Sequence, residues 1–345
     1  MMPTEEIKID PETDQKRQQR RKKMEEYAPL IFEECYVKHK GLSKVANGFE
    51  LEQDRELASK IDPTGGIKPE QIEFQAQPQY QGLHLFVLSH GFQGSSFDMR
   101  VMKNAIALAL PEAIFLQTTS NEGQTDGDIA EMGYRLSQEV LQYIRENCPG
   151  NQLSRITFIG YSMGGLMVRA ALPYLDRLKD KFHGFVSLCV PHLGYMYKTS
   201  KLFSTGIWLM NKWKKSTSIG QMRMADASRL EDCYLYRLAQ CEGLSWFKHM
   251  VLVSSYQDQY APFDSARIQI CKEAAKDVSR GSGYIQMVNS LLSSVPFNVL
   301  YRLDVNFNIE ENNLDSYIGR TAHILFLENE ELLKMIVARY KVIFN

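Results

Sequence analysis

From residue 83 onward, short apolar runs alternate with longer segments in which apolar residues recur every three or four positions. The runs that we interpret as strands are 83–89, 113–118, 155–160, 184–190, 250–255 and 297–307. The helical spacing predicts helices over 97–110, 128–147, 163–178 and 328–340. Near-continuous apolar strands that alternate with helices are typical of a mostly parallel sheet with helices on both faces. We therefore predict an α/β fold for residues 80–345.

The first 79 residues lack this alternation and are rich in polar side chains. We interpret them as a partly disordered extension with a possible helix, because residues 25–50 show only weak amphipathic spacing. The basic cluster at 16–23 favours a solvated start to a helix, with a localisation signal or a contact with anionic lipid as the alternatives. The turn-rich stretch 62–69 is typical of a linker.

Composition excludes several classes of protein. Hydrophobic residues make up 44% and charged residues 23% of the 345 residues, and the formal net charge is -1. This balance is ordinary for a globular protein and gives no field that would attract nucleic acid. We find no secretory signal and no apolar run near the roughly 18 residues of a membrane span. The six cysteines form no CxxC pair, so we expect no metal site, a reduced compartment, a cytoplasmic location and mostly buried thiols.

The clearest chemical signal is the sequence GYSMG at 160–164, which stands between a predicted strand and a predicted helix. A serine at such a sharp turn projects its hydroxyl from a strained backbone, and glycines on either side avoid collisions with the turn and the neighbouring strand. The N–H of Met163, at the start of the helix, can then bind a developing oxyanion. Ser162 is therefore the candidate nucleophile.

A nucleophilic serine needs a base and an acid that orients it, and this motif predicts the chain order serine, acid, histidine. Asp258 follows the predicted strand 250–255, and His323 lies after the last predicted strand, in what we interpret as a loop. Asp264 and Asp304 are rival acids, although Asp264 is better interpreted as a helix N-cap. The sequence predicts Ser162, His323 and Asp258 as a catalytic triad.

The loop after the strand 83–89 offers the second oxyanion donor. Its sequence HGFQG places the N–H of Phe92 or Gln93 where it could point at the same carbonyl oxygen, with His90 bracing the loop. His192, in VPHLG after the fourth predicted strand, lies near the site. We expect it to shape the hinge of the segment that follows and, with Gln93, to line the substrate-binding region.

With these motifs, the chain resembles the lipase-like serine esterases of the α/β-hydrolase superfamily. The similarity is carried by LSHGFQGSSFDMR, FIGYSMGGLMVRAAL, VPHLG, SSYQDQYAPFDSARI and GRTAHILF, between about residue 80 and the C-terminus. It is nearest to the hydrolase domain at the C-terminal end of a group of larger eukaryotic proteins. The resemblance implies Ser162 as nucleophile, Asp258 as acid, His323 as base, and Phe92 with Met163 as oxyanion donors. We expect the first antiparallel strands of that fold to be missing or reduced to pieces such as 71–75.

The segment of about 195–248, between the fourth and fifth predicted strands, is where hydrolases of this fold often place a helical cap. It contains Trp208 among other apolar residues, flanked by lysines. A cap of this kind would suit an acyl chain, with Trp208 binding substrate, and peripheral contact with a membrane. A helix pair packed on the core is the alternative.

The sequence thus predicts a serine hydrolase that cleaves carboxylic esters, with lipid esters favoured, through an acyl-enzyme and without metal or cofactor. The same triad would serve a thioesterase or an amidase, because the triad acts on the carbonyl group and the pocket selects the rest. A non-catalytic hydrolase-like module that binds lipid or protein is a third hypothesis.

Overall fold

The computed structural model describes residues 30–35, 82–150, 152–197, 216–296, 298–309 and 315–344. One sheet of seven strands runs through this part of the chain, in the order β1-β7-β6-β5-β4-β2-β3. The strands are β1 (Leu30–Cys35), β2 (Leu83–Ser89), β3 (Ile114–Gln117), β4 (Leu153–Tyr161), β5 (Phe182–Leu188), β6 (His249–Ser254) and β7 (Leu300–Asn306). From β7 to β3 all neighbours pair in parallel, and β1 pairs antiparallel with β7. The predicted mostly parallel sheet is confirmed, and the chain has the α/β-hydrolase fold.

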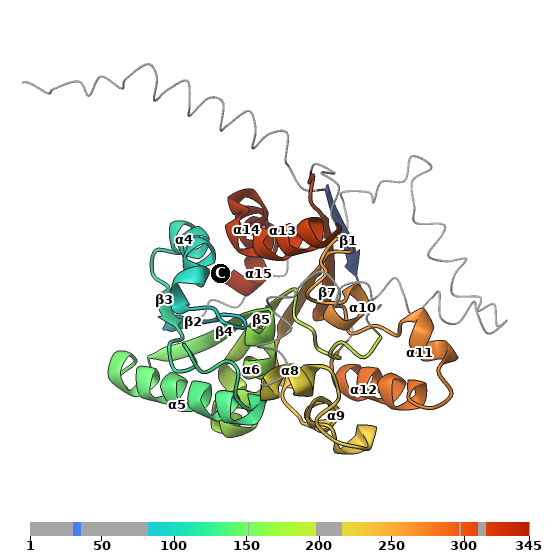
Figure 1. The fold of residues 1–345 in the computed structure, drawn as a ribbon. Helices are drawn as coiled ribbons and strands as arrows, with labels where there is room; N and C mark the ends of the chain where they lie inside the picture. The colour runs from blue at the N-terminus through green and yellow to red at the C-terminus, as the bar shows by residue number, and fades with distance from the viewer. Residues whose placement is uncertain are drawn as a thin grey trace, which may run out of the picture.

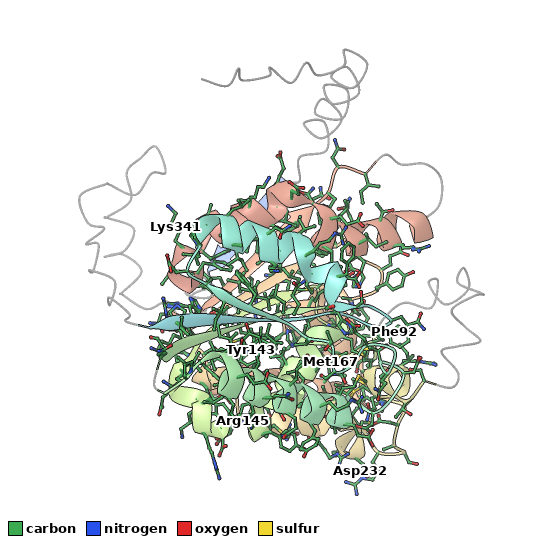
Figure 2. The ribbon with its side chains drawn as sticks, turned by 90° about the vertical axis from the view of Figure 1, so that its left-hand side faces the viewer. Phe92, Tyr143, Arg145, Met167, Asp232 and Lys341 are labelled. Carbon is green, nitrogen blue, oxygen red and sulfur yellow. The ribbon has the colours of Figure 1, made fainter. Side chains whose placement is uncertain are left out.

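Helices lie on both faces of the sheet (Figure 1). The α-helices are α4 (Arg100–Ala109), α5 (Ile129–Asn147), α6 (Met163–Ala171), α8 (Thr217–Met222), α9 (Tyr234–Gln240), α10 (Phe263–Ala266), α11 (Lys272–Lys276), α12 (Gly281–Ser293), α13 (Asp315–Glu328), α14 (Glu330–Arg339) and α15 (Lys341–Phe344). The 3-10 turns are η2 (Ser96–Met99), η3 (Leu172–Tyr174), η4 (Asp176–Lys181), η6 (Leu230–Asp232) and η7 (Leu244–Trp246). Figure 2 shows the sheet edge-on, with α4, α13 and α14 on one side and α5 on the other.

Alternate residues of the parallel strands build two separate hydrophobic cores, one on each face of the sheet. In β2, Leu85 and Val87 join the core beneath α5 and α6, whereas Phe86 and Leu88 join the core beneath α4 and α14. All four side chains are fully buried. Because a strand turns successive side chains to opposite faces, a strand that is covered on both sides must be apolar throughout.

The parallel arrangement determines where chemistry can gather. The strands β2, β4, β5 and β6 are parallel neighbours, so their carboxyl ends lie along one edge of the sheet. Ligands of open parallel sheets bind beyond that edge. The loop residues that the sequence singled out follow these strands and therefore meet there.

The N-terminal part corrects one prediction. Residues 30–35 form a strand and not part of a helix, and their register on β7 runs from Leu30 opposite Asn306 to Cys35 opposite Tyr301. A short apolar run cannot be assigned by periodicity alone, and an unpaired sheet edge provides hydrogen-bonding groups for a strand that the local pattern does not reveal. The rest of the extension, with the basic cluster and residues 71–75, lies outside the described residues.

Helix boundaries differ from prediction mainly after the candidate nucleophile. The predicted helix 163–178 ends as α6 at Ala171 and gives way to 3-10 turns. Pro173 explains the early end, because proline has no N–H to donate and its ring collides with the preceding turn. The described part of the insertion, 216–248, contains α8, α9 and two 3-10 turns, which confirms its helical character.

Candidate active site

Ser162 lies at the sharp turn between β4 and α6. Its backbone has φ 52° and ψ -127°, in a region that residues other than glycine rarely adopt, so the strain expected from the motif is present. The Ser162 N–H donates to the carbonyl oxygen of Leu188 at 2.8 Å, which ties the turn to the end of β5. The side chain is held at the carboxyl edge of the sheet and only 7% of the residue is exposed.

The glycines on either side of Ser162 are required by close contacts of the backbone. A Cβ on Gly164 would lie 2.3 Å from the carbonyl oxygen of Ser89, at the end of β2. A Cβ on Gly160 would lie 2.4 Å from the Cα of Gly165, in the following helix. Both distances are well below any van der Waals contact, so the predicted need for glycine at these two positions is confirmed.

His323 projects toward Ser162 from α13. Its Nε2 is 3.1 Å from the Ser162 Oγ, and its Nδ1 is 2.7 Å from the Asp258 Oδ2. The prediction that His323 lies in a loop is wrong, because α13 spans Asp315–Glu328. The position of His323 after the last predicted strand was interpreted as a loop, but Ala322, Leu325 and neighbouring residues favour a helix, and the buried Phe326 anchors it to the core.

Asp258 lies in the loop between β6 and α10 and is buried. Its Oδ1 accepts hydrogen bonds from the backbone N–H groups of Tyr260, at 2.7 Å, and Ala261, at 3.0 Å. Its Oδ2 remains for His323, as given above. The carboxylate is therefore fixed in place by its own loop while its second oxygen orients the imidazole.

The rival acids have other partners. Asp304, on β7, accepts a hydrogen bond from Ser254 at 2.9 Å and forms an ion pair with Arg267. Asp264 lies in the first turn of α10, and burial raises its carboxyl pKa. The interpretation of Asp264 as the N-cap is wrong, because Pro262 occupies that position. Of the three acids, Asp258 is the one that contacts His323.

Two tyrosines and a glycine position His323, a role that the sequence did not predict for them. The rings of Tyr161 and Tyr260 lie 5.0 Å and 5.2 Å from the imidazole, centroid to centroid. The Tyr161 hydroxyl also donates to the backbone carbonyl of His323 at 3.1 Å. A Cβ on Gly319 would lie 2.1 Å from the Cγ of Gln259, so glycine allows α13 to approach the loop that carries the acid.

The loop after β2 lies directly against the nucleophile. A Cβ on Gly91 would be 3.1 Å from the Cβ of Ser162. Phe92 follows and is half-buried at the end of the sheet where β2 ends (Figure 2). The N–H of Gln93 donates to the Thr125 Oγ1 at 2.8 Å, which leaves Phe92 as the better candidate donor of the pair. The side chain of Gln93 is exposed.

His90 braces this loop, as the sequence predicts. It is fully buried, and its Nδ1 lies 3.0 Å from the carbonyl oxygen of Gly91, to which it can donate. Met163 begins α6 and is fully buried, so its N–H is one of the first-turn donors that lack a partner within the helix.

His192 has a structural environment. It has no exposed surface, its Nε2 is 2.8 Å from the Ser187 Oγ, and its carbonyl oxygen accepts from the guanidinium of Arg169 at 2.9 Å. Burial, with the nearby Arg169 charge, lowers the pKa of His192 well below its usual value. This burial does not support the predicted contact with substrate and fits the role in the hinge instead. Trp208 lies outside the described residues.

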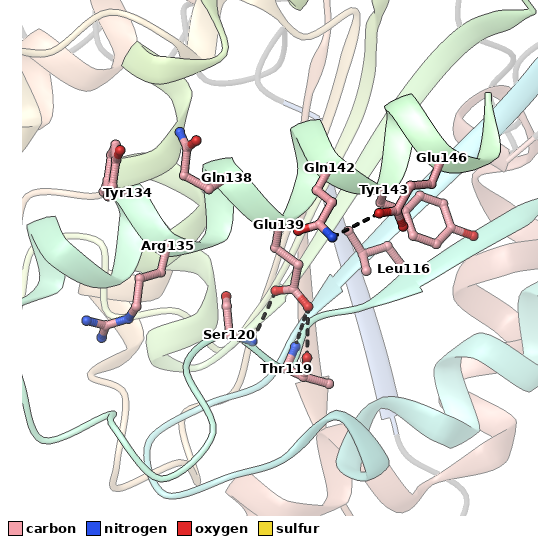
Figure 3. Close-up of a pocket in the computed structure, with 10 residues that line it drawn as sticks. All are labelled: Leu116, Thr119, Ser120, Tyr134, Arg135, Gln138, Glu139, Gln142, Tyr143 and Glu146. Carbon is pink, nitrogen blue, oxygen red and sulfur yellow. Dashed lines mark hydrogen bonds between the residues drawn. The ribbon is translucent and has the colours of Figure 1, made fainter. Parts of the chain in front are cut away.

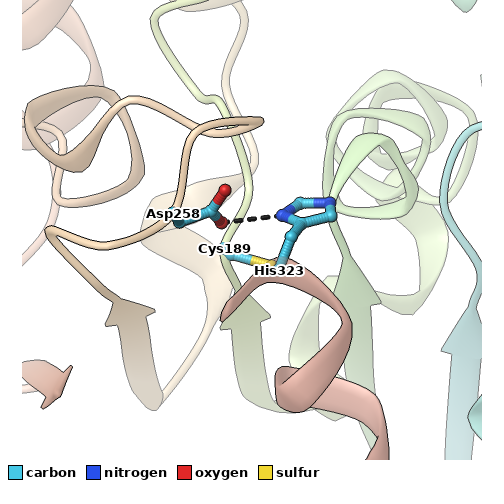
Figure 4. A group of neighbouring side chains, drawn as sticks. All are labelled: Cys189, Asp258 and His323. Carbon is cyan, nitrogen blue, oxygen red and sulfur yellow. Dashed lines mark hydrogen bonds and ion pairs between the residues drawn. The ribbon is translucent and has the colours of Figure 1, made fainter. Parts of the chain in front are cut away.

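Cys189 lies beside the acid and the base, which the sequence did not predict. It follows β5 with φ 44° and is fully buried. The ligand atoms of Cys189, Asp258 and His323 all lie within 4.8 Å of one another. Figure 4 shows the three side chains beside one another. Burial, together with the charge of Asp258, raises the pKa of the Cys189 thiol well above its usual value.

A separate hollow lies between β3 and α5, away from these residues. It has a volume of about 510 Å³ and is lined mainly by polar side chains of α5 (Figure 3). Glu139 crosses it and accepts from the N–H groups of Thr119 and Ser120 at 2.8 Å and 3.1 Å. None of Ser162, Asp258 and His323 lines it, so we do not assign the chemistry to this hollow.

Within the ranges that the structure describes, we find no helix with the length and apolar character needed to cross a membrane.

Comparison with known proteins supports a hydrolase. Residues 79–273 match the family described as "Putative serine esterase (DUF676)", a range that includes Ser162 and Asp258 but ends before His323. A Saccharomyces cerevisiae protein named "Putative lipase" is 26% identical over 176 residues. That match covers 46% of this chain and only 24% of the relative, so the chain spans about a quarter of that protein.

Solved structures of similar proteins include esterases. A lipase-esterase related protein from Clostridium acetobutylicum is 12% identical, covers 76% of this chain and 97% of its own, and has a TM-score of 0.39. An esterase from Pyrobaculum calidifontis is 15% identical, with coverages of 76% and 80% and a TM-score of 0.40. Such low scores say nothing about substrate. The family match extends over more than half of the chain and includes the turn that carries Ser162, and the chain therefore belongs to the serine esterase family that this match defines.

Proposed function

We propose that this protein is a carboxylic ester hydrolase in which Ser162, His323 and Asp258 act as a catalytic triad. The observation that carries the proposal is the continuous chain of contacts from the Ser162 Oγ to the His323 Nε2, at 3.1 Å, and from the His323 Nδ1 to Asp258, at 2.7 Å. Both distances are within the range over which a proton can be transferred or a tautomer held. The family match supports the same class of activity.

The reaction begins with attack by Ser162. Its Oγ forms a bond to the ester carbonyl carbon while the His323 Nε2 takes the hydroxyl proton. The tetrahedral intermediate collapses as His323 returns that proton to the leaving alcohol, which leaves an acyl group on Ser162. Water then attacks the acyl carbon as the His323 Nε2 takes its proton. The bond between the acyl carbon and the Ser162 Oγ breaks, His323 returns the proton to that Oγ, and the acid is released.

Asp258 orients the base and balances its charge. A hydrogen bond from the His323 Nδ1–H to Asp258 keeps the proton on Nδ1, so Nε2 presents a lone pair to Ser162. When His323 becomes an imidazolium, the buried carboxylate stabilises it. The two N–H groups that donate to the Asp258 Oδ1 stop the carboxylate from rotating.

We assign the oxyanion hole to the backbone N–H groups of Phe92 and Met163. The β2 loop packs against Ser162 at Gly91, and Met163 immediately follows the nucleophile, so the two donors approach the same carbonyl oxygen from two sides. Preorganised donors of this kind stabilise a developing negative charge without reorganisation during the reaction.

The substrate class that we favour is a lipid ester. The matched Saccharomyces cerevisiae relative is named "Putative lipase", and the insertion of about 195–248 contains an apolar stretch suited to an acyl chain. Membrane contact through this insertion, and a role for Trp208, remain predictions.

A panel of p-nitrophenyl esters with acyl chains of increasing length tests the proposal. We expect hydrolysis by the wild-type protein and a fall to the uncatalysed background in Ser162→Ala. Ser290→Ala, which removes a hydroxyl on α12 that donates to Gln240 and to none of the triad residues, is the matched control and should hydrolyse at the wild-type rate. Hydrolysis by Ser162→Ala at the wild-type rate would overturn the assignment. Matched thioesters and amides in the same assay identify the preferred bond.

A further inference from the structure

Three side chains of the kinds that bind zinc converge at the candidate active site. Cys189 follows β5, Asp258 follows β6 and His323 projects from α13, and their ligand atoms lie within 4.8 Å of one another. We propose that they form an inhibitory binding site for a thiophilic divalent cation, Zn²⁺ in the first instance. This inference rests on the proposed function, because inhibition requires the triad to be catalytic.

The donor set fits such a cation. Zn²⁺ binds thiolate, imidazole and carboxylate at about 2.0–2.3 Å in a tetrahedron, which puts neighbouring ligand atoms about 3.3–3.5 Å apart. A pair of ligand atoms near the 4.8 Å upper bound of the cluster must contract by roughly an ångström. The Asp258–His323 contact, now 2.7 Å, must instead open by about 0.6–0.8 Å. The catalytic hydrogen bond and the metal are therefore alternatives.

Burial strengthens the site and limits what can enter. Cys189 has no exposed surface and Asp258 is buried, so their interaction with a cation is screened by little water. The His323 side chain is 12% exposed and provides the entry side. As the metal–sulfur bond forms, the thiol loses its proton to solvent.

A bound cation would stop catalysis through either ring nitrogen. Coordination by the His323 Nδ1 moves the remaining ring proton to Nε2, which then cannot accept the proton of Ser162. Coordination by Nε2 occupies the acceptor directly. In both cases Asp258 is engaged by the metal and no longer orients the imidazole.

Cadmium titration tests binding without relying on activity. We expect Cd²⁺ to produce an ultraviolet thiolate-to-metal charge-transfer band that saturates at one equivalent in the full-length protein. Cys189→Ala should lose this band. Cys241→Ala, which removes an exposed thiol, should retain it. If Cys189→Ala fails to fold, Cys189→Ser serves in its place. Absence of the one-equivalent band, or its survival in the Cys189 variant, would overturn the proposal.

Ester hydrolysis provides the second measurement. We expect Zn²⁺ to lower the rate at least tenfold, with recovery on adding a chelator, and we expect Mg²⁺ to have no effect because it prefers oxygen ligands. Each variant is compared with its own rate without metal, and Cys189→Ala should lose most of the zinc sensitivity. Equal sensitivity in wild type and Cys189→Ala would contradict the site. A protein that gives the cadmium band but hydrolyses no ester would refute the proposed function and leave the metal site standing.

Discussion

Asp258 uses its two carboxylate oxygens for different tasks. One accepts two backbone N–H groups of its own loop, and the other faces the Nδ1 of His323. A carboxylate held in this way can fix the imidazole tautomer without moving during the reaction. Asp304 is also held by hydrogen bonding, but its partners are Ser254 and Arg267. Its charge is therefore paired with Arg267 and does not orient His323.

Replacing Asp258 should leave the fold unchanged and should remove most of the catalytic turnover. Asp258→Asn retains the size of the side chain but presents an amide to His323, which favours the wrong tautomer. We expect kcat for an ester substrate to fall on the order of 10⁴-fold. Asp264→Asn is the control and should stay near wild type, because Asp264 lies on α10 and does not contact His323 in the structure. Steady-state kinetics of the two variants decide the matter, and a larger loss in Asp264→Asn would contradict the assignment.

At the residue level, the sequence predicted the members of the site that follow strands in a fixed chain order. Ser162, Asp258 and His323 were each predicted from their residue type and their position after a strand. Tyr161 and Cys189 could not be predicted as their neighbours, because they contact His323 and Asp258 only through the folding of the sheet and are far from them in sequence. The choice between Phe92 and Gln93 as oxyanion donor also depends on the folded structure, because the Gln93 N–H donates to Thr125.

At the scale of elements, α13 must approach the acid loop closely to deliver His323. Gly319 makes this possible, since a Cβ there would lie 2.1 Å from the Cγ and 2.3 Å from the Cβ of Gln259. The loop from Asp258 to Ala261 is held by its own hydrogen bonds and cannot easily retreat. The distance between base and acid therefore depends on the absence of a single side chain.

Gly319→Ala should displace α13 and separate His323 from Asp258. We expect kcat to fall on the order of 10- to 100-fold, because small displacements of catalytic groups have large effects on rate. Gly220→Ala, in α8, is the matched control, since nothing lies within 4 Å of its added Cβ. The control should retain wild-type kcat. Equal kcat values in the two variants would show that the approach of α13 does not position the base.

The elements themselves were predicted best where hydrophobic periodicity continued without interruption. The strands of the parallel sheet and α5 agree closely with their predicted ranges. Their burial on one or both faces requires a regular spacing of apolar residues, which is visible in the sequence. The helix that carries His323 was missed because the residues after the last strand were interpreted as a loop. Strand β1 was missed because its partner, β7, follows almost 270 residues later in the chain.

At the scale of the whole molecule, the end of the sheet opposite the candidate active site contains a row of three histidines, two buried and one half-buried. His84, His183 and His249 are on β2, β5 and β6, and neighbouring rings are 5.4 Å and 5.3 Å apart. Burial is the main cause that lowers their pKa values, to about 2, about 3 and about 4 respectively. The folded protein therefore keeps all three imidazoles neutral at pH values where exposed histidines are charged.

This row predicts loss of stability in mild acid. Because the native pKa values are lower than the unfolded value near 6.5, the unfolded chain binds more protons as the pH falls. Stability is thus fully present above about pH 7 and declines from about pH 6.5 toward pH 4. Urea unfolding at several pH values should show this decline. His84→Gln should reduce the slope by roughly 1.4 kcal/mol per pH unit, and an unchanged slope in that variant would contradict the account.

The central claim is that Ser162 is a nucleophile activated by His323 and Asp258. The most direct measurement is covalent labelling by a fluorophosphonate, followed by peptide mass mapping of the folded protein. We predict a single phosphonyl adduct on Ser162, formed much more slowly in His323→Ala because the base is missing. A folded wild-type protein that remains unlabelled, or an adduct on a different residue, would contradict the account.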